Sequence, residues 1–268
     1  MWLDTLARAS VAKRSVLWAD CTVSPTRAFA DQLQRWTGKA VAAVHHGFDH
    51  ELFFREQGPL PADVRRKLDW AGDCVRILHV SHYNYFRNFE TLFRAIPLLR
   101  QKLPGKKIRL LLTCKLREGE NPGAYKTQAA AALVERLGIG AEVVELCAVP
   151  YRVLHQVYRA CDLYVTCSYA ETFAHPLVEA MASGLPVVAS DLAVHREVCE
   201  DAAEYFPRFN SSALAERASE ILASGDLWSS KAERARIRAR AFRWDKHVAE
   251  IVDLLRRHSG LQPARQIA

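Results

Sequence analysis

A chain of 268 residues with 50% hydrophobic content is long enough to bury one large core or two small ones, which excludes a disordered chain. The 37 Lys and Arg residues exceed the 30 Asp and Glu residues, so the formal net charge of +7 favours anionic partners such as nucleotides or an acidic membrane surface. No zinc-finger spacing or aromatic RNA-binding motif accompanies this charge, so nucleic-acid binding is not predicted.

The seven cysteines are odd in number and scattered, and several fall inside predicted strands. We therefore expect buried thiols in a reducing compartment. The sequence has no C-x-x-C pair, so it predicts no metal site. No apolar run reaches membrane-spanning length and residues 1–4 do not begin a signal peptide, which predicts a cytoplasmic protein.

The first 54 residues predict a helix-like stretch followed by two short strands and the helix between them. The strands are expected over Cys21–Ser24 and Ala40–Val44, and the helix over Pro25–Thr37 with Ser24 as its cap. Two strands are too few for an independent sheet, because a parallel sheet is normally buried on both faces.

From residue 73 onward, strands and helices alternate with the regularity of a doubly wound, parallel-sheet α/β fold. This regularity predicts a second, Rossmann-like domain. The predicted segments are strands Val75–Ser81, Ile108–Thr113 and Val143–Leu146, and helices Phe89–Lys102, Tyr125–Leu137 and Tyr151–Ala160.

The stretch Cys161–Asp191 predicts a βαβ unit. Leu163–Thr166 is a β-rich run, Pro176 suits the first turn of a helix and Gly184 its end, and Leu185–Ala189 is a second buried strand. Ligands of an open parallel sheet bind where strands end and helices begin, so the loop between strand and helix is expected on the binding rim.

Glu171 lies in that loop and Glu179 about one turn inside the helix, so both are expected to approach a ligand at the helix N-terminus. The helix dipole favours an anion such as a diphosphate there. A carboxylate accepts strong hydrogen bonds from hydroxyl groups, which makes sugar hydroxyls the expected partners of the two acids. The alternative is a solvated loop residue and a surface helix residue.

The pattern E-x7-E in ETFAHPLVEAMASGLPVVASD resembles the signature of glycosyltransferase family 4, the retaining enzymes whose GT-B architecture joins two Rossmann domains. Resemblance implies that Glu171 contacts the donor sugar near the reacting carbon and that Glu179 binds the ribose hydroxyls. It also implies that the amides after Glu171 hold sugar and diphosphate. These amides belong to Thr172, Phe173, Ala174 and His175.

Two departures from the family pattern occur in this loop and one in the loop after the first strand of the second domain. The family often has Gly where this chain has Thr172 and Ala174, and a side chain at Ala174 narrows the freedom of the loop. His82 occupies the position of the usual Arg. The alternative role for His82 is a surface histidine.

Arg87 occupies the position of the family's diphosphate-binding Lys, and an arginine can bind phosphate with two parallel hydrogen bonds. Resemblance implies that Arg87 stabilises the leaving diphosphate; the alternative is a solvated loop charge. Lys115 and Val149 follow two further strands on the same rim, and by resemblance the turn at Val149 borders the nucleotide base.

The C-terminal part predicts a helix over Ser211–Ala223 and then six cations within thirteen residues, 231–243. This charge run suggests peripheral membrane contact, although a solvated surface is the alternative we favour. His195 is expected to be a structural cap. The helix Lys246–His258 resembles the family's last helix, which crosses back to the N-terminal domain, and it is expected to pack on residues 1–54.

The resemblance divides the chain into three parts: a remnant of the N-terminal Rossmann domain with its linker over residues 1–54, a nucleotide-sugar-binding domain over 55–244, and a crossover helix and tail over 245–268. It implies a retaining glycosyltransferase that moves a sugar from a nucleoside-diphosphate sugar to a hydroxyl of an unknown acceptor, whether a saccharide, a lipid-linked saccharide or a small molecule. No cofactor is expected.

Two other functions stay open. The chain is alternatively a non-catalytic nucleotide-sugar-binding subunit or half-enzyme that needs a separate N-terminal domain. A separate N-terminal domain or a second copy of this chain is the expected protein partner. A nucleotide-sugar epimerase of the same architecture is disfavoured by the match over Glu171–Gly184.

Overall fold

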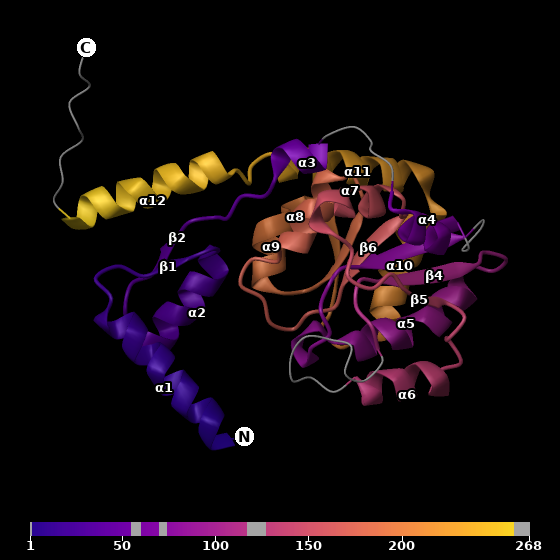
Figure 1. The fold of residues 1–268 in the computed structure, drawn as a ribbon, viewed down its shortest axis with the longest axis horizontal. Coiled ribbons are helices and arrows are strands. Elements are labelled where there is room, and N and C mark those ends of the chain that lie inside the picture. Colours follow the sequence, from indigo (N-terminus) through magenta and orange to yellow (C-terminus); the bar gives the residue numbers. More distant parts are fainter. Residues whose placement is uncertain (1, 55–59, 70–73, 117–126, 260–268) are drawn as a thin grey trace, which may run out of the picture. The chain divides into compact units, whose positions relative to one another are not determined.

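The computed structural model describes residues 2–54, 60–69, 74–116 and 127–259 (Figure 1). The chain forms two compact units. Unit 1 comprises Met1–Phe48 and Phe242–Ala268, and unit 2 comprises Asp49–Ala241.

Unit 2 is built on a six-stranded sheet in the order β5-β4-β3-β6-β7-β8, in which every neighbouring pair is parallel. The strand order reverses between β3 and β6. The strands are β3 (Val75–His79), β4 (Ile108–Leu112), β5 (Val143–Glu145), β6 (Leu163–Thr166), β7 (Val187–Ser190) and β8 (Ala203–Phe206). The predicted doubly wound fold is therefore confirmed.

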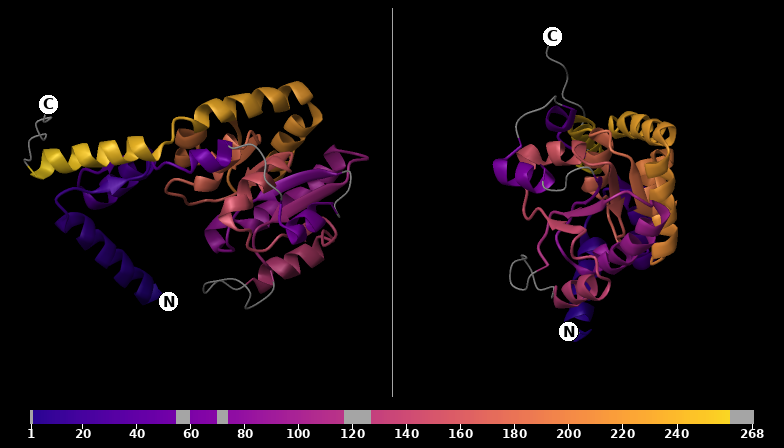
Figure 2. Two further views of the ribbon diagram at one scale, coloured as in Figure 1. Left: turned by 45° about the horizontal axis from the view of Figure 1, so that its top comes forward. Right: turned by 90° about the vertical axis from the view of Figure 1, so that its right-hand side faces the viewer.

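Helices cover both faces of this sheet (Figures 1 and 2). One face carries α5 (Phe89–Lys102), α6 (Gln128–Arg136) and α10 (Ser211–Ala223), and the other carries α7 (Tyr151–Arg159), α8 (His175–Ala182), α9 (Ala193–Cys199) and α11 (Gly225–Ala239). The shorter helical elements of unit 2 are α3 (His50–Phe54), α4 (Ala62–Asp69) and the 3-10 turns η1 (Tyr85–Arg87) and η2 (Glu200–Ala202).

Successive side chains of a strand point to opposite faces of the sheet, and in unit 2 both faces are covered by helices, so neighbouring strand residues are apolar. Ile77 and Val165 face the core cluster that contains Phe93 of α5. Tyr164 points to the opposite face, where its ring lies 5.8 Å from that of Tyr158 on α7. Strands buried on both sides read as continuous apolar runs, which is why the sequence predicts them well.

Unit 1 contains a two-stranded parallel sheet of β1 (Val23–Ser24) and β2 (Ala42–Ala43), with helices α1 (Trp2–Trp18), α2 (Arg27–Thr37) and α12 (Trp244–Ser259). The prediction that Ser24 caps the first interstrand helix is wrong. Thr26 is the cap, because its extended backbone lets Oγ1 accept from the N–H of Phe29, whereas the Ser24 hydroxyl donates to the Thr26 carbonyl.

The expected packing of the last helix on the N-terminal segment is observed around residues 45–48. His247 on α12 bonds through Nδ1 to the carbonyl oxygen of His45, at 2.9 Å. A Cβ at Gly47 would lie 2.2 Å from the backbone nitrogen of Trp244, so only glycine permits this close approach. Residues 260–268 of the predicted tail lie outside the described part of the chain.

Two cations of the run 231–243, both on α11, bond to the segment 198–204 of unit 2. The Lys231 ammonium is buried, donates to the carbonyl oxygen of Asp201 at 3.0 Å and pairs with Glu204 at 2.7 Å. Arg238 donates to the Val198 carbonyl oxygen and pairs with Glu200. The interpretation of all six cations as a solvated surface is therefore wrong for these two. None of the described helices is both long and apolar enough to span a membrane.

Candidate functional site

A pocket of about 350 Å³ lies at the carboxyl edge of the unit 2 sheet, at the point where the strand order reverses. This is where open parallel sheets bind ligands, because the strand ends diverge there and leave a crevice. Loops after β3, β4 and β5 and the first turns of α7 and α8 line it. The lining residues are Val80, Ser81, His82, Asn84, Arg87, Thr113, Ala148, Val149, Leu154, His175, Pro176 and Glu179.

Arg87 provides the positive charge of this pocket. Asn84 caps η1 by accepting from the Arg87 N–H at 3.1 Å, which fixes the start of the side chain. The guanidinium forms an ion pair with Glu171 and donates to the Ser168 hydroxyl at 3.4 Å. Burial lowers the pKa of Arg87, which nevertheless stays charged because its ordinary pKa is so high. Within the described residues, Arg87 Nε has no hydrogen-bond partner.

Glu179 provides the acid of this pocket. Its side chain is buried on α8, and the Tyr158 hydroxyl donates to Oε2 at 3.0 Å. Burial raises the pKa of Glu179 to about 7, while the Tyr158 hydrogen bond opposes that rise. A hydroxyl donor from a ligand would favour the charged form, so the carboxylate is poised to accept a hydrogen bond near neutral pH.

The N-terminus of α8 opens on the same edge. Ala174 is the cap residue and has φ 69° and ψ 65°, the left-handed region that favours glycine. Glycine would adopt this backbone conformation more readily than the alanine that stands here. Pro176 lies in the first turn, and the N–H of Leu177 bonds to the Ala174 carbonyl oxygen at 3.0 Å. The positive end of the α8 dipole thus lies beside Arg87 and favours an anion.

The structure brings five of the ten predicted site residues to the pocket wall: His82, Arg87, Val149, His175 and Glu179. The other five lie elsewhere. Glu171 turns to Arg87, with 7% of its side chain exposed. Phe173 and Ala174 are buried, Thr172 is exposed, and Lys115 is half-buried beyond the end of β4.

Several polar residues at the site were not predicted. Tyr158 positions Glu179, Ser168 contacts Arg87, and Ser81 bonds through its N–H to Thr113 Oγ1 at 3.0 Å. Asn84 had a signal, because an Asn three residues before Arg87 fits an N-cap pattern. Tyr158 and Ser168 had none, since their partners are distant in sequence.

Two buried histidines lie close enough to Arg87 for its charge to help lower their pKa. His79 bonds through Nδ1 to the Val165 carbonyl oxygen, and His195 through Nδ1 to that of Ser190, both at 2.8 Å. Burial lowers the pKa of each to about 4, so both are neutral at pH 7. The prediction of His195 as a cap is wrong: Leu192 precedes α9 as its cap, and His195 ties the helix to β7.

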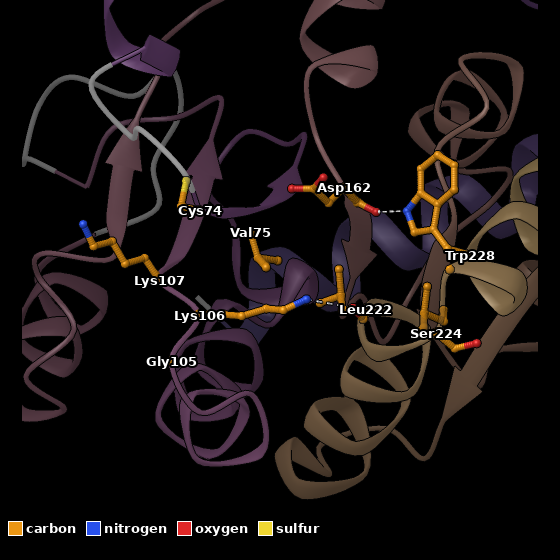
Figure 3. Close-up of a pocket in the computed structure, with 11 residues that line it drawn as sticks. Cys74, Val75, Gly105, Lys106, Lys107, Asp162, Leu222, Ser224 and Trp228 are labelled. Atoms are coloured by element: carbon orange, nitrogen blue, oxygen red, sulfur yellow. Dashed lines mark hydrogen bonds between the residues drawn. The ribbon is translucent and has the colours of Figure 1, made fainter.

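A second pocket, of about 440 Å³, lies at the opposite edge of the sheet (Figure 3). Two of its polar side chains are bonded to the main chain: the Trp228 indole donates to the Asp162 carbonyl oxygen at 2.7 Å and Lys106 to that of Leu222 at 3.4 Å. We therefore assign the candidate site to the carboxyl edge. Among the described residues, no group of three His, Cys, Asp or Glu side chains is placed to hold a metal ion.

Comparison with known sequences gives a family match and several relatives. The family model for glycosyl transferases group 1 matches residues 62–244. A D-inositol 3-phosphate glycosyltransferase of Xylanimonas cellulosilytica is 26% identical over 258 residues, which are 92% of this chain and 59% of the relative. The enzyme of the same name from Nocardia farcinica is 33% identical over 131 residues, covering 49% of this chain and 28% of the relative. The chain thus spans only part of the length of both.

Solved structures show the same fold. Sucrose-phosphate synthase from Thermosynechococcus elongatus has a TM-score of 0.78 and 24% identity over 94% of this chain and 61% of its own. HepE of Anabaena in complex with UDP-glucose has a TM-score of 0.78 and 21% identity, covering 94% of this chain and 67% of its own. At these identities the likeness shows the fold alone, which is of the GT-B type.

Proposed function

The chain belongs to the group 1 glycosyl transferases, and we propose that the carboxyl-edge pocket of unit 2 binds a nucleoside-diphosphate sugar whose sugar is transferred to an acceptor hydroxyl. One observation carries this proposal: Arg87, the N-terminus of α8 and Glu179 converge on one pocket at the reversal of the strand order. A cation and a helix dipole suit a diphosphate, and a buried carboxylate suits the hydroxyls of a ribose.

We further propose that transfer retains the configuration at the anomeric carbon, as the resemblance of Glu171–Gly184 to family 4 implies. The bond from the anomeric carbon to the diphosphate breaks, a bond to the acceptor oxygen forms on the same face, and the acceptor proton passes to the departing phosphate oxygen. The task of the protein is then positioning and charge stabilisation, with Arg87 facing the negative charge that develops.

The Arg87–Glu171 ion pair suggests how the pocket prepares for its ligand. A diphosphate would compete with Glu171 for the guanidinium, whose Nε is buried and without a hydrogen-bond partner among the described residues. Glu171 would then be released toward the donor sugar. The Arg87 guanidinium would thus face a negative partner both without ligand, where the partner is Glu171, and with ligand, where it is the diphosphate. This limits the free-energy cost of burying its charge.

Calorimetric titration with UDP, GDP and ADP tests the nucleotide site. HepE was solved with UDP-glucose, which supports UDP as the first probe. We expect Glu179→Gln to weaken binding by about 1.5–3 kcal/mol, the usual contribution of a hydrogen bond to a charged group. Glu135→Gln, on an exposed position of α6, is the matched control. Equal affinity of wild type and Glu179→Gln would remove the ribose role.

The second candidate function is a nucleotide-sugar-binding subunit or half-enzyme without transfer activity of its own. The two-stranded sheet of unit 1 favours it, because such a sheet is small for an acceptor-binding Rossmann domain. A donor-turnover assay with a broad acceptor panel separates the two functions. Location in a reducing compartment stays a prediction from the sequence. The described cysteines form no disulfide with one another.

A further inference from the structure

Two exposed aromatic rings lie together at the carboxyl edge of unit 2, outside the pocket described above. Tyr169, just beyond β6, is 36% exposed, and Phe209, just beyond β8, is 61% exposed. Their ring centroids are 5.5 Å apart and the ring planes are tilted by 39°. Burial in a core therefore does not explain the position of Phe209.

Phe209 has φ 65°, a left-handed backbone conformation that is unusual for a bulky residue. The turn that holds it is well defined: the N–H of Asn210 bonds to the Pro207 carbonyl oxygen at 3.1 Å, and Asn210 Oδ1 caps α10. A glycine would suit this position without strain. The chain thus carries an exposed phenyl ring where the backbone favours no side chain at all, and such strain gathers at functional sites.

The loop that follows β6 links the ring pair to the site, because it carries both Tyr169 and Glu171. The N–H of Tyr169 bonds to the Phe86 carbonyl oxygen at 2.9 Å, next to Arg87, and Glu171 follows two residues later. The pocket extends from Arg87 toward the loops after β4 and β5, whereas Tyr169 and Phe209 follow β6 and β8 on the other side of the sheet centre. An acceptor that approaches the donor sugar at Glu171 from the β6–β8 side of the sheet would therefore contact the two rings.

We propose that Tyr169 and Phe209 form a platform for the acceptor, and that the acceptor presents the C–H face of a pyranose ring to it. This proposal rests on the proposed function. The electron-rich face of an aromatic ring attracts the weakly positive C–H groups of a sugar face. Arg208 and Asn210, both exposed beside Phe209, offer polar groups to the hydroxyl rim of the sugar. A protein partner would need a far larger surface than two rings in polar surroundings.

Saturation-transfer NMR with methyl β-D-glucopyranoside as the probe tests the platform in the full chain. Irradiation of the aromatic protons should transfer saturation to the ring C–H protons of the probe. We expect Phe209→Gly to weaken probe binding about five- to tenfold, the loss of one aromatic contact. This variant relieves the left-handed strain, so its melting temperature should be no lower than that of wild type. Ile237→Ser, at another exposed apolar side chain of unit 2, is the control.

Calorimetry with UDP on the same proteins separates the two proposals. If UDP binds wild type and Phe209→Gly equally and only the variant loses the probe, the platform is supported. If UDP binds but wild type and Phe209→Gly bind the probe equally, the platform proposal is wrong and the nucleotide site is unaffected. The same holds if UDP binds but wild type transfers no saturation to the probe. Probe binding through these rings without any UDP binding would instead contradict the proposed function.

Discussion

The burial of the Glu179 side chain sets the pKa of its carboxyl group and thereby the pH range in which it can accept hydrogen bonds. The side chain is a carboxyl on α8 with a buried neighbour, the Tyr158 hydroxyl, and it faces a pocket that also holds Arg87. Burial disfavours the carboxylate, which raises its pKa to about 7. An acid held in this way binds a hydroxyl donor at neutral pH and loses that ability as the pH falls.

The stability of unit 2 should therefore depend on pH through Glu179. The native state retains a proton that the unfolded chain loses above its own pKa of 4.5, so the favourable contribution is complete below pH 4.5 and is lost as the pH rises through about 7. The loss amounts to about 3 kcal/mol at most. Urea unfolding at pH 5 and pH 8 should show that Glu179→Gln flattens this slope. An equal slope in wild type and variant would contradict the assignment.

The Arg87–Glu171 pair should contribute more than a surface ion pair. The two side chains are only 22% and 7% exposed, so removing one leaves the other charge poorly solvated. We expect Arg87→Ala to cost about 1–3 kcal/mol of unfolding free energy and the double variant with Glu171→Ala to cost less than the sum. The exposed pair Arg196–Asp191 is the control, where Arg196→Ala should cost under about 1 kcal/mol. Additive costs for Arg87 and Glu171 would contradict this coupling.

At the residue scale, the sequence predicts site residues only where a local pattern marks them. Arg87, His175 and Glu179 lie in motifs with fixed spacing, and all three line the pocket. The direction of Glu171 toward Arg87 depends on two loops that are 84 residues apart, and no spacing encodes it. The role of Tyr158 could not be predicted for the same reason, because its contact with Glu179 forms only when α7 packs beside α8.

The start of α8 is the element on which the site depends. Its cap residue Ala174 adopts φ 69°, where a Cβ costs about 1–2 kcal/mol. Ala174→Gly should therefore raise the unfolding free energy by up to about 1 kcal/mol, whereas Ala180→Gly in the middle of the same helix should lower it by a similar amount. Urea unfolding measures both. A destabilised Ala174→Gly would show that the buried Cβ matters more than the backbone strain.

Element existence was easier to predict than element ends. Five of the six parallel strands of unit 2 are apolar runs that the sequence predicts in the correct order. The sixth, β8, was not predicted, because only its end residues Ala203 and Phe206 are buried and Glu204 interrupts the apolar pattern. β3 ends at His79 and not at Ser81, because the Ser81 N–H bonds to a side chain, Thr113 Oγ1, and leaves the ladder. The predicted helix 125–137 is present from Gln128, and Tyr125 lies outside the described residues.

At the scale of the whole molecule, unit 1 has much exposed apolar surface for its size. Among its residues whose side chains the structure describes, nine large hydrophobic side chains are exposed, while its sheet has two strands. The exposed residues are Leu6, Val11, Leu17, Trp18, Val23, Trp36, Trp244, Val248 and Leu255. Such surface on a small unit indicates an interaction site.

We expect the 268-residue chain to self-associate. The double variant Val11→Ser, Trp18→Ser should shift the sedimentation profile toward the 30.2 kDa monomer, because these side chains are 64% and 81% exposed. Ile237→Ser in unit 2, at a side chain that is 60% exposed, should leave the profile unchanged. A wild-type monomer at every concentration would contradict this expectation.

We also expect the purified chain to bind a nucleotide but to transfer sugar negligibly. In the GT-B architecture the facing domain aligns the acceptor with the donor, and orientation contributes about 7–11 kcal/mol to a barrier, or roughly five to eight decades in rate. Two strands supply little of such a domain. Brisk transfer that depends on an acceptor and is abolished by Glu171→Ala would show that unit 1 suffices.

The crystal structure of the chain with UDP tests the central claim most directly, because it locates the nucleotide. We predict a diphosphate within hydrogen-bond distance of Arg87 at the N-terminus of α8, with a ribose hydroxyl on Glu179 and the Arg87–Glu171 pair separated. A nucleotide bound at the opposite edge of the sheet, between Lys106 and Trp228, would contradict it.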